Sequence, residues 1–205
     1  QFPNNIKFYS KLNNAELFFN EEGITYIANY GNKNINSDYS SIFNNIHKLS
    51  KKEYFCFELK FINPNNSLTI EGEKPLLTKI NYIIGNNPTK WKSNVSSYEK
   101  IIYKELYKNI DLIYYTNNDN IKYDFILKPD ANFKEIKFKY KGYKSIKSDK
   151  EGNLIITFNH GKIIETKPIL YQIIDGKRIN IVGKYNLDQN EVISFDINTY
   201  NKKYP

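Results

Sequence analysis

Methionine is absent from the 205 residues of this chain, and cysteine occurs once. The single Cys56 cannot form an internal disulfide, which excludes a disulfide-stapled fold, and one thiol does not identify the redox compartment. Because Cys56 lies in the strand-like stretch Tyr54–Phe61, we expect it to be a small buried side chain of the core. A chain without an initial methionine is expected to be processed or truncated at its start, so any signal peptide would already be gone.

Side chains that carry common enzymatic chemistry are also scarce. The two histidines, His47 and His160, have no Ser or Cys partner at a triad-like position, so a catalytic triad is not expected. The scattered His, Cys and acidic residues show no zinc-ligand spacing, and there is no Gly-rich loop for phosphate. We therefore predict that the chain is not an enzyme and uses no cofactor.

Long apolar runs are missing as well, and the charges are unbalanced. No run approaches the roughly 18–20 residues of a transmembrane helix, so we predict no membrane span. The 30 Lys and Arg exceed the 22 Asp and Glu, which gives a net charge of +8. Because the lysines are spread along the chain instead of clustered, we expect no specific nucleic-acid partner and interpret the excess as codon bias. A weak attraction to anionic polymers or surfaces is the alternative.

Aromatic residues, in contrast, are abundant, with 18 Tyr and 13 Phe. Such residues fit pleated, half-buried surfaces, and short alternating segments recur between turn signals such as Asn117–Asn120 and Asp175-Gly176. The clearest segment is Glu53–Ile62, whereas Tyr98–Tyr107 has no clean face and is assigned as a strand by its β-branched and aromatic content. These features predict an all-β fold, either an antiparallel β-sandwich or a sandwich-like barrel.

The order of these segments indicates the domain organisation. A three-stranded meander is expected over residues 6–29, followed by a polar insertion at residues 30–52. Within the insertion, Ser41–Lys51 has the spacing of one short amphipathic helix, the only helix expected. Glu71–Pro75 is the candidate boundary between an N-terminal β meander subdomain, residues 1–74, and a main antiparallel β domain, residues 75–205. One continuous domain is the alternative.

Several segments resemble a known family. They are Q-F-P-N-N-I-K-F at 1–8, N-Y-I-I-G-N-N-P-T-K-W at 81–91, Y-K-N-I-D-L-I-Y-Y at 107–115, K-Y-D-F-I-L-K-P-D-A at 122–131, G-N-L at 152–154, K-P-I-L-Y-Q at 167–172 and F-D-I-N-T-Y at 195–200. Together they resemble the N-terminal domain of unknown function that precedes SBBP-type β-propeller repeats and other modules in large secreted bacterial proteins. Those proteins are often Bacteroidetes proteins of the gliding-motility and sorting-domain type.

The resemblance implies an extracellular or cell-surface module whose partners are the downstream domains of the same polypeptide. It implies no reaction. The chain departs from the family pattern in two places. The length of the segment at residues 30–52 varies in the family, and residues 108–111 read K-N-I-D where P-G-I-D is common.

Three acidic residues are candidates for a site. Asp111 and Asp124 lie in predicted strands among apolar neighbours, where an unpaired charge would be costly. They would serve either as a general acid and base or, with Asp119, as ligands of Ca²⁺. The favoured interpretation is structural, in which each carboxylate caps a turn or pairs with a Lys or Tyr and no metal is bound.

Trp91, the only tryptophan, is the candidate ligand-binding residue. It lies in a predicted loop, where it would either plug the end of the sandwich, the favoured role, or stack on a sugar ring together with Tyr82, Tyr98 and Tyr103. The sequence thus favours a non-catalytic structural or adhesive module at the N-terminal end of a larger secreted protein. A carbohydrate-binding module is the alternative, with surface polysaccharide or another surface protein as partner. The first predicts exposed apolar area where the C-terminus leaves, and the second predicts aromatic residues along one groove.

Overall fold

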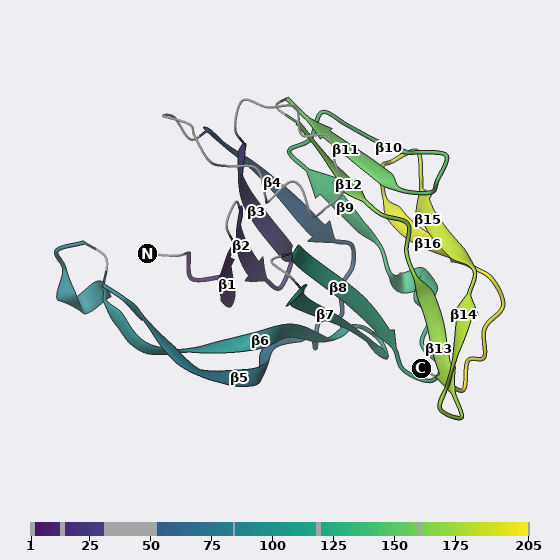
Figure 1. Cartoon of the computed structure of the whole chain (residues 1–205), viewed down its shortest axis with the longest axis horizontal. Helices are drawn as coiled ribbons and strands as arrows, with labels where there is room; N and C mark the ends of the chain where they lie inside the picture. The colour runs from purple at the N-terminus through teal and green to yellow at the C-terminus, as the bar shows by residue number, and fades with distance from the viewer. Residues whose placement is uncertain are drawn as a thin grey trace.

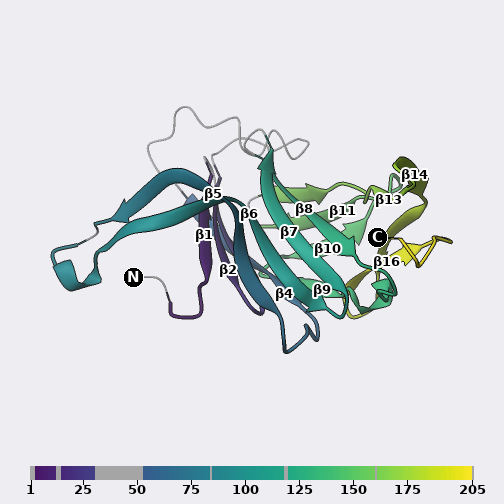
Figure 2. The same cartoon turned by 90° about the horizontal axis from the view of Figure 1, so that it is seen from below.

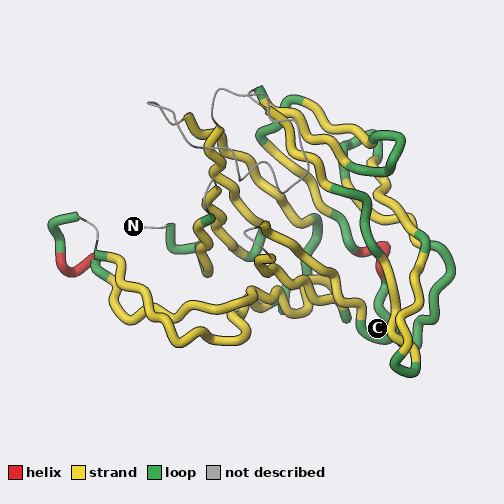
Figure 3. Tube along the Cα trace, viewed as in Figure 1, coloured by secondary structure: helices red, strands yellow, loops and turns green. Residues whose placement is uncertain are grey.

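The computed structural model describes residues 3–12, 15–30, 53–83, 85–117, 120–159 and 161–204. These ranges contain sixteen strands and two short 3-10 helices, and all strand pairs are antiparallel. Strands dominate the trace in Figure 3. The predicted all-β, sandwich-like fold is therefore confirmed. The helix expected at Ser41–Lys51 lies outside the described residues.

The largest sheet contains seven strands in the order β1-β2-β3-β4-β9-β16-β15. Their bounds are β1 (Phe8–Lys11), β2 (Ala15–Asn20), β3 (Gly23–Tyr30), β4 (Glu53–Phe61), β9 (Phe138–Lys141), β15 (Gly183–Leu187) and β16 (Ile193–Ile197). β1 to β3 form the predicted meander. A glycine is needed at Gly23, because an added Cβ would lie 1.9 Å from the carbonyl oxygen of Leu59. The ladder between β9 and β16 has a single register pair, Ile193 with Phe138.

A second sheet has the order β5-β6-β7-β8. Its strands are β5 (Thr69–Tyr82), β6 (Lys92–Tyr107), β7 (Ile110–Asn117) and β8 (Asn120–Leu127). The strand predicted at Tyr98–Tyr107 is confirmed as part of β6. The candidate boundary Glu71–Pro75 lies inside β5, where the chain continues in the sheet.

The outer part of β5 and β6 leaves the body of the domain as a two-stranded ribbon, which we call the β5–β6 arm (residues 75–98). It curves away beneath the N-terminus and ends at the 3-10 helix η1, Pro88–Lys90 (Figure 1). The register of the arm shifts between Pro75 and Lys79 and again between Ile80 and Tyr82. Such irregularities bend and twist a ribbon. The arm and the C-terminus lie at opposite ends of the molecule in both views (Figures 1 and 2).

Two smaller sheets complete the fold. One contains β10 (Ser145–Ser148), β11 (Leu154–Phe158) and β12 (Gly161–Glu165), and the other is the hairpin of β13 (Leu170–Ile174) and β14 (Lys177–Ile181). The predicted turn at Asp175-Gly176 is confirmed. Both residues have positive φ, 50° and 76°, as a tight hairpin turn of the favoured twist requires. A second 3-10 helix, η2 (Phe133–Glu135), precedes β9.

One face of the seven-stranded sheet carries the core. Phe61 of β4 packs edge-on to Tyr103 of β6 at 5.2 Å between ring centroids, and Phe57 of β4 packs on Phe158 of β11 at 4.9 Å. The strands β6 to β8 and β10 to β12 therefore cover the same face side by side. A single hydrophobic cluster joins residues from both sides of the candidate boundary at residues 71–75.

Candidate functional site

Tyr103, one of the four aromatic candidates, is a core residue. Its side chain is fully buried, and its hydroxyl donates hydrogen bonds to the carbonyl oxygens of Asn20 and Gly23 at 3.1 and 3.2 Å. Burial raises the pKa of its phenol well above the ordinary value. The prediction that Tyr103 contributes to an exposed platform is wrong, because the inward face of β6 closes the sandwich.

Tyr98 and Tyr82 lie at different levels of the arm. Tyr98 packs edge-on to Phe8 of β1 at 5.9 Å, and its ring covers Gly72, where an added Cβ would lie 2.4 Å from the ring. Tyr82 pairs with Lys92 near the outer end of the arm. The four candidates therefore do not line one groove, and the sugar platform as predicted does not form.

Trp91 follows η1 at the tip of the arm, with 40% of its surface exposed. Its indole N–H donates to the carbonyl oxygen of Gly85 at 3.1 Å, which fixes the ring across the loop. Asn87 caps η1 by accepting hydrogen bonds from the backbone N–H and the hydroxyl of Thr89. The favoured role of Trp91 as a plug is wrong, because the tip lies beyond the core.

Asp111 secures an irregular turn of the β6 backbone. Glu105 has a φ of +52° at a register shift in β6, and its backbone N–H donates to Asp111 Oδ1 at 2.8 Å. Lys128 donates to both carboxylates, at 2.7 Å to Glu105 and 2.9 Å to Asp111. These hydrogen bonds lower the pKa of Glu105 and raise that of Lys128. Asp111 therefore has the structural partners that the favoured interpretation expected.

The other acidic candidates do not join Asp111 in a cluster. Asp124 accepts a hydrogen bond from the hydroxyl of Tyr115 at 3.1 Å, and Asp119 lies outside the described residues. In the part of the chain that the structure describes, no group of three or more His, Cys, Asp and Glu side chains could hold a metal ion. Over the same residues, no helix has the length and apolar character needed to cross a membrane.

Cys56 is exposed, so the prediction of a buried core thiol is wrong. Phe57 and Leu59 of β4 are buried, and the pleat places Cys56 on the opposite face. Partial burial and the nearby Glu58 carboxylate raise the pKa of the thiol, which disfavours the reactive thiolate.

A buried acid that sequence reasoning missed lies where three sheets meet. Glu165, at the end of β12, is 4% exposed and accepts hydrogen bonds from Tyr140 of β9, at 3.1 Å, and from Tyr123 of β8. The Tyr123 hydroxyl also lies 3.4 Å from that of Tyr185 on β15. Burial raises the pKa of Glu165, and the two tyrosine hydrogen bonds oppose that rise. The cluster links the sheets from inside the core.

An exposed apolar surface lies on and beside the β13–β14 hairpin. Four of its large apolar side chains are between 46% and 77% exposed: Ile169, Tyr171, Ile173 and Val182. Ile179, which is 44% exposed, pairs with Gln172 and lies on the opposite face of the hairpin. Arg178 lies over the ring of Tyr171 at 4.0 Å from the centroid. We call this surface the C-terminal face, because the chain ends beside it (Figure 1).

Gln172 fastens the last residues of the chain to this hairpin. Its side chain is buried, and its amide nitrogen donates to the carbonyl oxygens of Asn201 and Tyr204 at 2.8 and 2.9 Å. Its amide oxygen accepts from the backbone N–H of Asn201 at 2.9 Å. One side chain therefore makes three hydrogen bonds to the backbone of the C-terminal segment.

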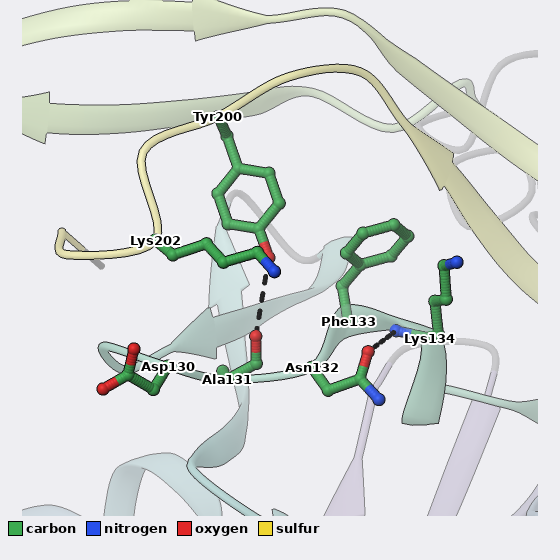
Figure 4. A pocket seen from close by; sticks show the side chains of 7 residues that line it. All are labelled: Asp130, Ala131, Asn132, Phe133, Lys134, Tyr200 and Lys202. Atoms are coloured by element: carbon green, nitrogen blue, oxygen red, sulfur yellow. Dashed lines mark hydrogen bonds between the residues drawn. The ribbon is translucent and has the colours of Figure 1, made fainter.

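The same segment crosses the loop before η2 and forms an open hollow of about 310 Å³ (Figure 4). Tyr200 donates to the carbonyl oxygen of Ala131 at 3.4 Å and packs edge-on to Phe133 at 5.9 Å. The backbone N–H of Asp130 donates to the carbonyl oxygen of Lys202 at 3.1 Å. These contacts fix the C-terminal segment to the body of the domain at the edge of the hollow.

The comparison with protein families matches residues 1–205 to a domain of unknown function, DUF7948. The resemblance expected from the sequence is thereby confirmed at the level of a domain of unknown function. The comparisons with curated proteins and with solved structures gave no match.

Proposed function

The chain belongs to the DUF7948 family of domains of unknown function, and from this premise we propose that it is a non-catalytic structural module of a larger secreted or cell-surface protein. In this role the C-terminal face packs against the part of the polypeptide that follows. The observation that carries the proposal is the exposed apolar surface beside the anchored end of the chain.

An apolar surface of this kind has a physical cost in water. Ile169 and Val182 are 77% and 70% exposed, and they flank the hairpin that also exposes Tyr171 and Ile173. Contiguous exposed apolar side chains beside a polar group such as Arg178 are typical of surfaces that bind another protein segment. A domain that follows directly would cover them at little entropic cost, because it is already tethered.

The anchored C-terminal segment gives such a neighbour a defined position. The three hydrogen bonds of Gln172, together with the Tyr200 and Asp130 contacts, fix the direction in which the chain leaves. A fixed exit beside an apolar surface favours a rigid junction over a flexible linker. The extracellular setting comes from the resemblance to N-terminal modules of secreted bacterial proteins, and an adhesive role of the whole protein is part of the same proposal.

Hydrogen–deuterium exchange tests the proposal. Residues 1–205 alone are compared with the larger polypeptide of which the proposal makes them a part. We expect slower exchange over residues 168–183 in the longer chain, and loss of that protection in the Ile169→Ser/Tyr171→Ser/Ile173→Ser variant. The control is Tyr54→Ser, which replaces an aromatic residue of β4 that is 60% exposed and outside the hairpin. It should leave the protection intact. Equal exchange in both lengths would refute the proposal.

A further inference from the structure

The outer part of the β5–β6 arm differs in charge from its base. At the base, lysines face glutamates across the hairpin: Lys104 lies 2.6 Å from Glu71, and Lys74 lies 3.6 Å from Glu99. Residues 75–98 contain Lys79, Lys90 and Lys92 and no Asp or Glu. Lys79 donates to the hydroxyl of Ser96 at 2.9 Å, which leaves its positive charge uncompensated. The end of the arm is therefore a cationic surface on a neutral stem.

The same part of the arm exposes large apolar side chains. They are Leu76 at 40%, Leu77 at 102%, Ile80 at 39%, Ile83 at 62% and Trp91 at 40% exposed. A two-stranded ribbon can bury such groups only if another layer packs on it. The arm extends away from the body of the domain (Figures 1 and 2). These side chains remain in water unless something outside the domain covers them.

The polar groups around the tip are bonded within the arm itself. The Trp91 indole N–H donates to Gly85, and the backbone N–H groups of Lys90 and Trp91 donate to the carbonyl oxygens of Asn87 and Pro88. Further down, the backbone N–H of Asn94 donates to the side chain of Asn81 at 2.8 Å, and the hydroxyl of Ser97 donates to the carbonyl oxygen of Thr78 at 2.6 Å. A segment whose donors are already bonded loses little when it leaves water.

From these observations we propose that the tip of the β5–β6 arm is an interfacial anchor that inserts into a bilayer containing anionic phospholipid. Ile83, Leu77 and Trp91 enter the boundary between headgroups and acyl chains, and Lys79, Lys90 and Lys92 contact the anionic headgroups. Apolar and indole side chains beside lysines are the combination that binds this boundary. The domain then lies on the membrane surface and no segment spans it.

The bonding pattern favours a lipid surface over a polysaccharide. A sugar-binding site presents polar groups that converge on hydroxyls beside an aromatic ring. Here the indole N–H and the Asn87 and Ser97 side chains are used inside the arm, and the other large exposed apolar side chains of the arm are aliphatic. The internal hydrogen bond of Trp91 also holds the ring in place before binding, which reduces the entropy lost on insertion.

The single tryptophan makes the proposal directly measurable on the intact chain. Vesicles of phosphatidylcholine alone, or with phosphatidylglycerol, are added while Trp91 fluorescence and its quenching by iodide are recorded. With the anionic vesicles we expect a blue shift and protection from iodide, and quenching by lipids brominated on the acyl chain. Binding should weaken as salt rises from 0.1 to 1 M, because the screening length falls from about 10 to about 3 Å.

Variants separate insertion from general attraction by the net positive charge. Each lysine near an anionic surface contributes about fivefold in affinity. Lys79→Gln/Lys90→Gln/Lys92→Gln should therefore lower the vesicle affinity, measured by cosedimentation, on the order of 100-fold. Leu77→Ser/Ile83→Ser should abolish the blue shift and leave the fold unchanged by circular dichroism. The control Lys144→Gln/Lys147→Gln/Lys150→Gln removes the same charge from exposed residues around β10 and should bind as the parent does.

Three results would overturn the proposal. The first is equal weakening in the control and arm lysine variants, which would mean non-specific attraction. The second is vesicle binding without any change at Trp91. The third is a blue shift of Trp91 fluorescence on adding a soluble polysaccharide but not on adding vesicles, which would assign the tip to sugar binding.

Discussion

The buried Glu165 allows a stability prediction with a defined sign. Glu165 accepts hydrogen bonds from Tyr123 and Tyr140, and burial raises its pKa in the folded state above that in the unfolded chain. Between these two pKa values the folded state binds more protons than the unfolded state, so stability falls as pH rises through this window. The contribution of Glu165 is thus most favourable below the unfolded value of about 4.3 and is lost above it.

Glu165→Gln removes this titration and keeps an amide that still accepts and donates hydrogen bonds. As pH rises above the unfolded value, we expect the free energy of unfolding of the variant to increase relative to that of the parent. The limiting slope of this difference is about 1.4 kcal/mol per pH unit between the unfolded and the folded pKa of Glu165. Tyr123 and Tyr185, near Glu165, have raised pKa values and stay neutral in this range. Glu71 and Asp149 have lowered pKa values, so their contributions to stability fall as pH drops below the ordinary carboxyl range, and they do so in both proteins. The difference between variant and parent is therefore the quantity to measure.

Glu165→Ala has a different expected result. It removes a hydrogen-bond acceptor of the Tyr123 and Tyr140 hydroxyls in the core, at about 1–3 kcal/mol for each lost hydrogen bond. The Tyr123 hydroxyl lies 3.4 Å from that of Tyr185, which recovers part of this loss. We therefore expect a loss of about 2–5 kcal/mol, measured by urea unfolding with far-UV circular dichroism at pH 5 and pH 8. A Gln variant with the same pH dependence as the parent would refute the reasoning, even if the Ala variant fails to fold.

Three further predictions concern the backbone and the core. Asp111→Ala should cost about 1–3 kcal/mol in urea unfolding, because the Glu105 N–H loses its acceptor, while Asp111→Asn keeps an acceptor and should cost less. Gly23→Ala should cost about 2–4 kcal/mol, because the added Cβ would clash with the backbone at Leu59. In Gly85→Ala the added Cβ meets nothing within 4 Å, so the cost of about 1 kcal/mol comes only from the φ of +74°. Equal shifts of the melting temperature in the two variants would contradict this reasoning. Tyr103→Phe should lose about 1 kcal/mol with its hydroxyl, and an unchanged midpoint would show that those bonds contribute nothing.

The sequence was sufficient for most strands and hairpins because these depend on local chemistry. The Asp175-Gly176 turn, the opening meander and the strand at Glu53–Phe61 follow from alternation and from residues that tolerate positive φ. The face that each strand buries is not a local property. In β4, Cys56 and Phe57 lie on opposite faces, as in any strand, and both faces carry apolar residues. Only the packing of the other sheets decides which face is buried.

The lack of a clean face in β6 has a specific cause. At Glu105 the backbone adopts a positive φ and the register shifts, so the alternation changes phase along the strand. Tyr103 is buried on one side of the irregularity, and Leu106 and Tyr107 are both buried on the other. The irregularity is held by Asp111 of β7 and by Lys128, which follows β8. Lys128 is 23 residues from Glu105 in sequence, so the local pattern around Glu105 contains only part of the cause.

The single register pair between β9 and β16 has a mechanical consequence. Tension applied to the C-terminus acts first on the three hydrogen bonds of Gln172, and then on the β15–β16 hairpin, which the Ile193–Phe138 pair connects to the rest of the large sheet. The ladders of β2, β3 and β4 are much longer, and they carry the load only after that hairpin separates. Under pulling we therefore expect the chain to unfold from its C-terminal end, while strands β1 to β4 and the β5–β6 arm stay folded.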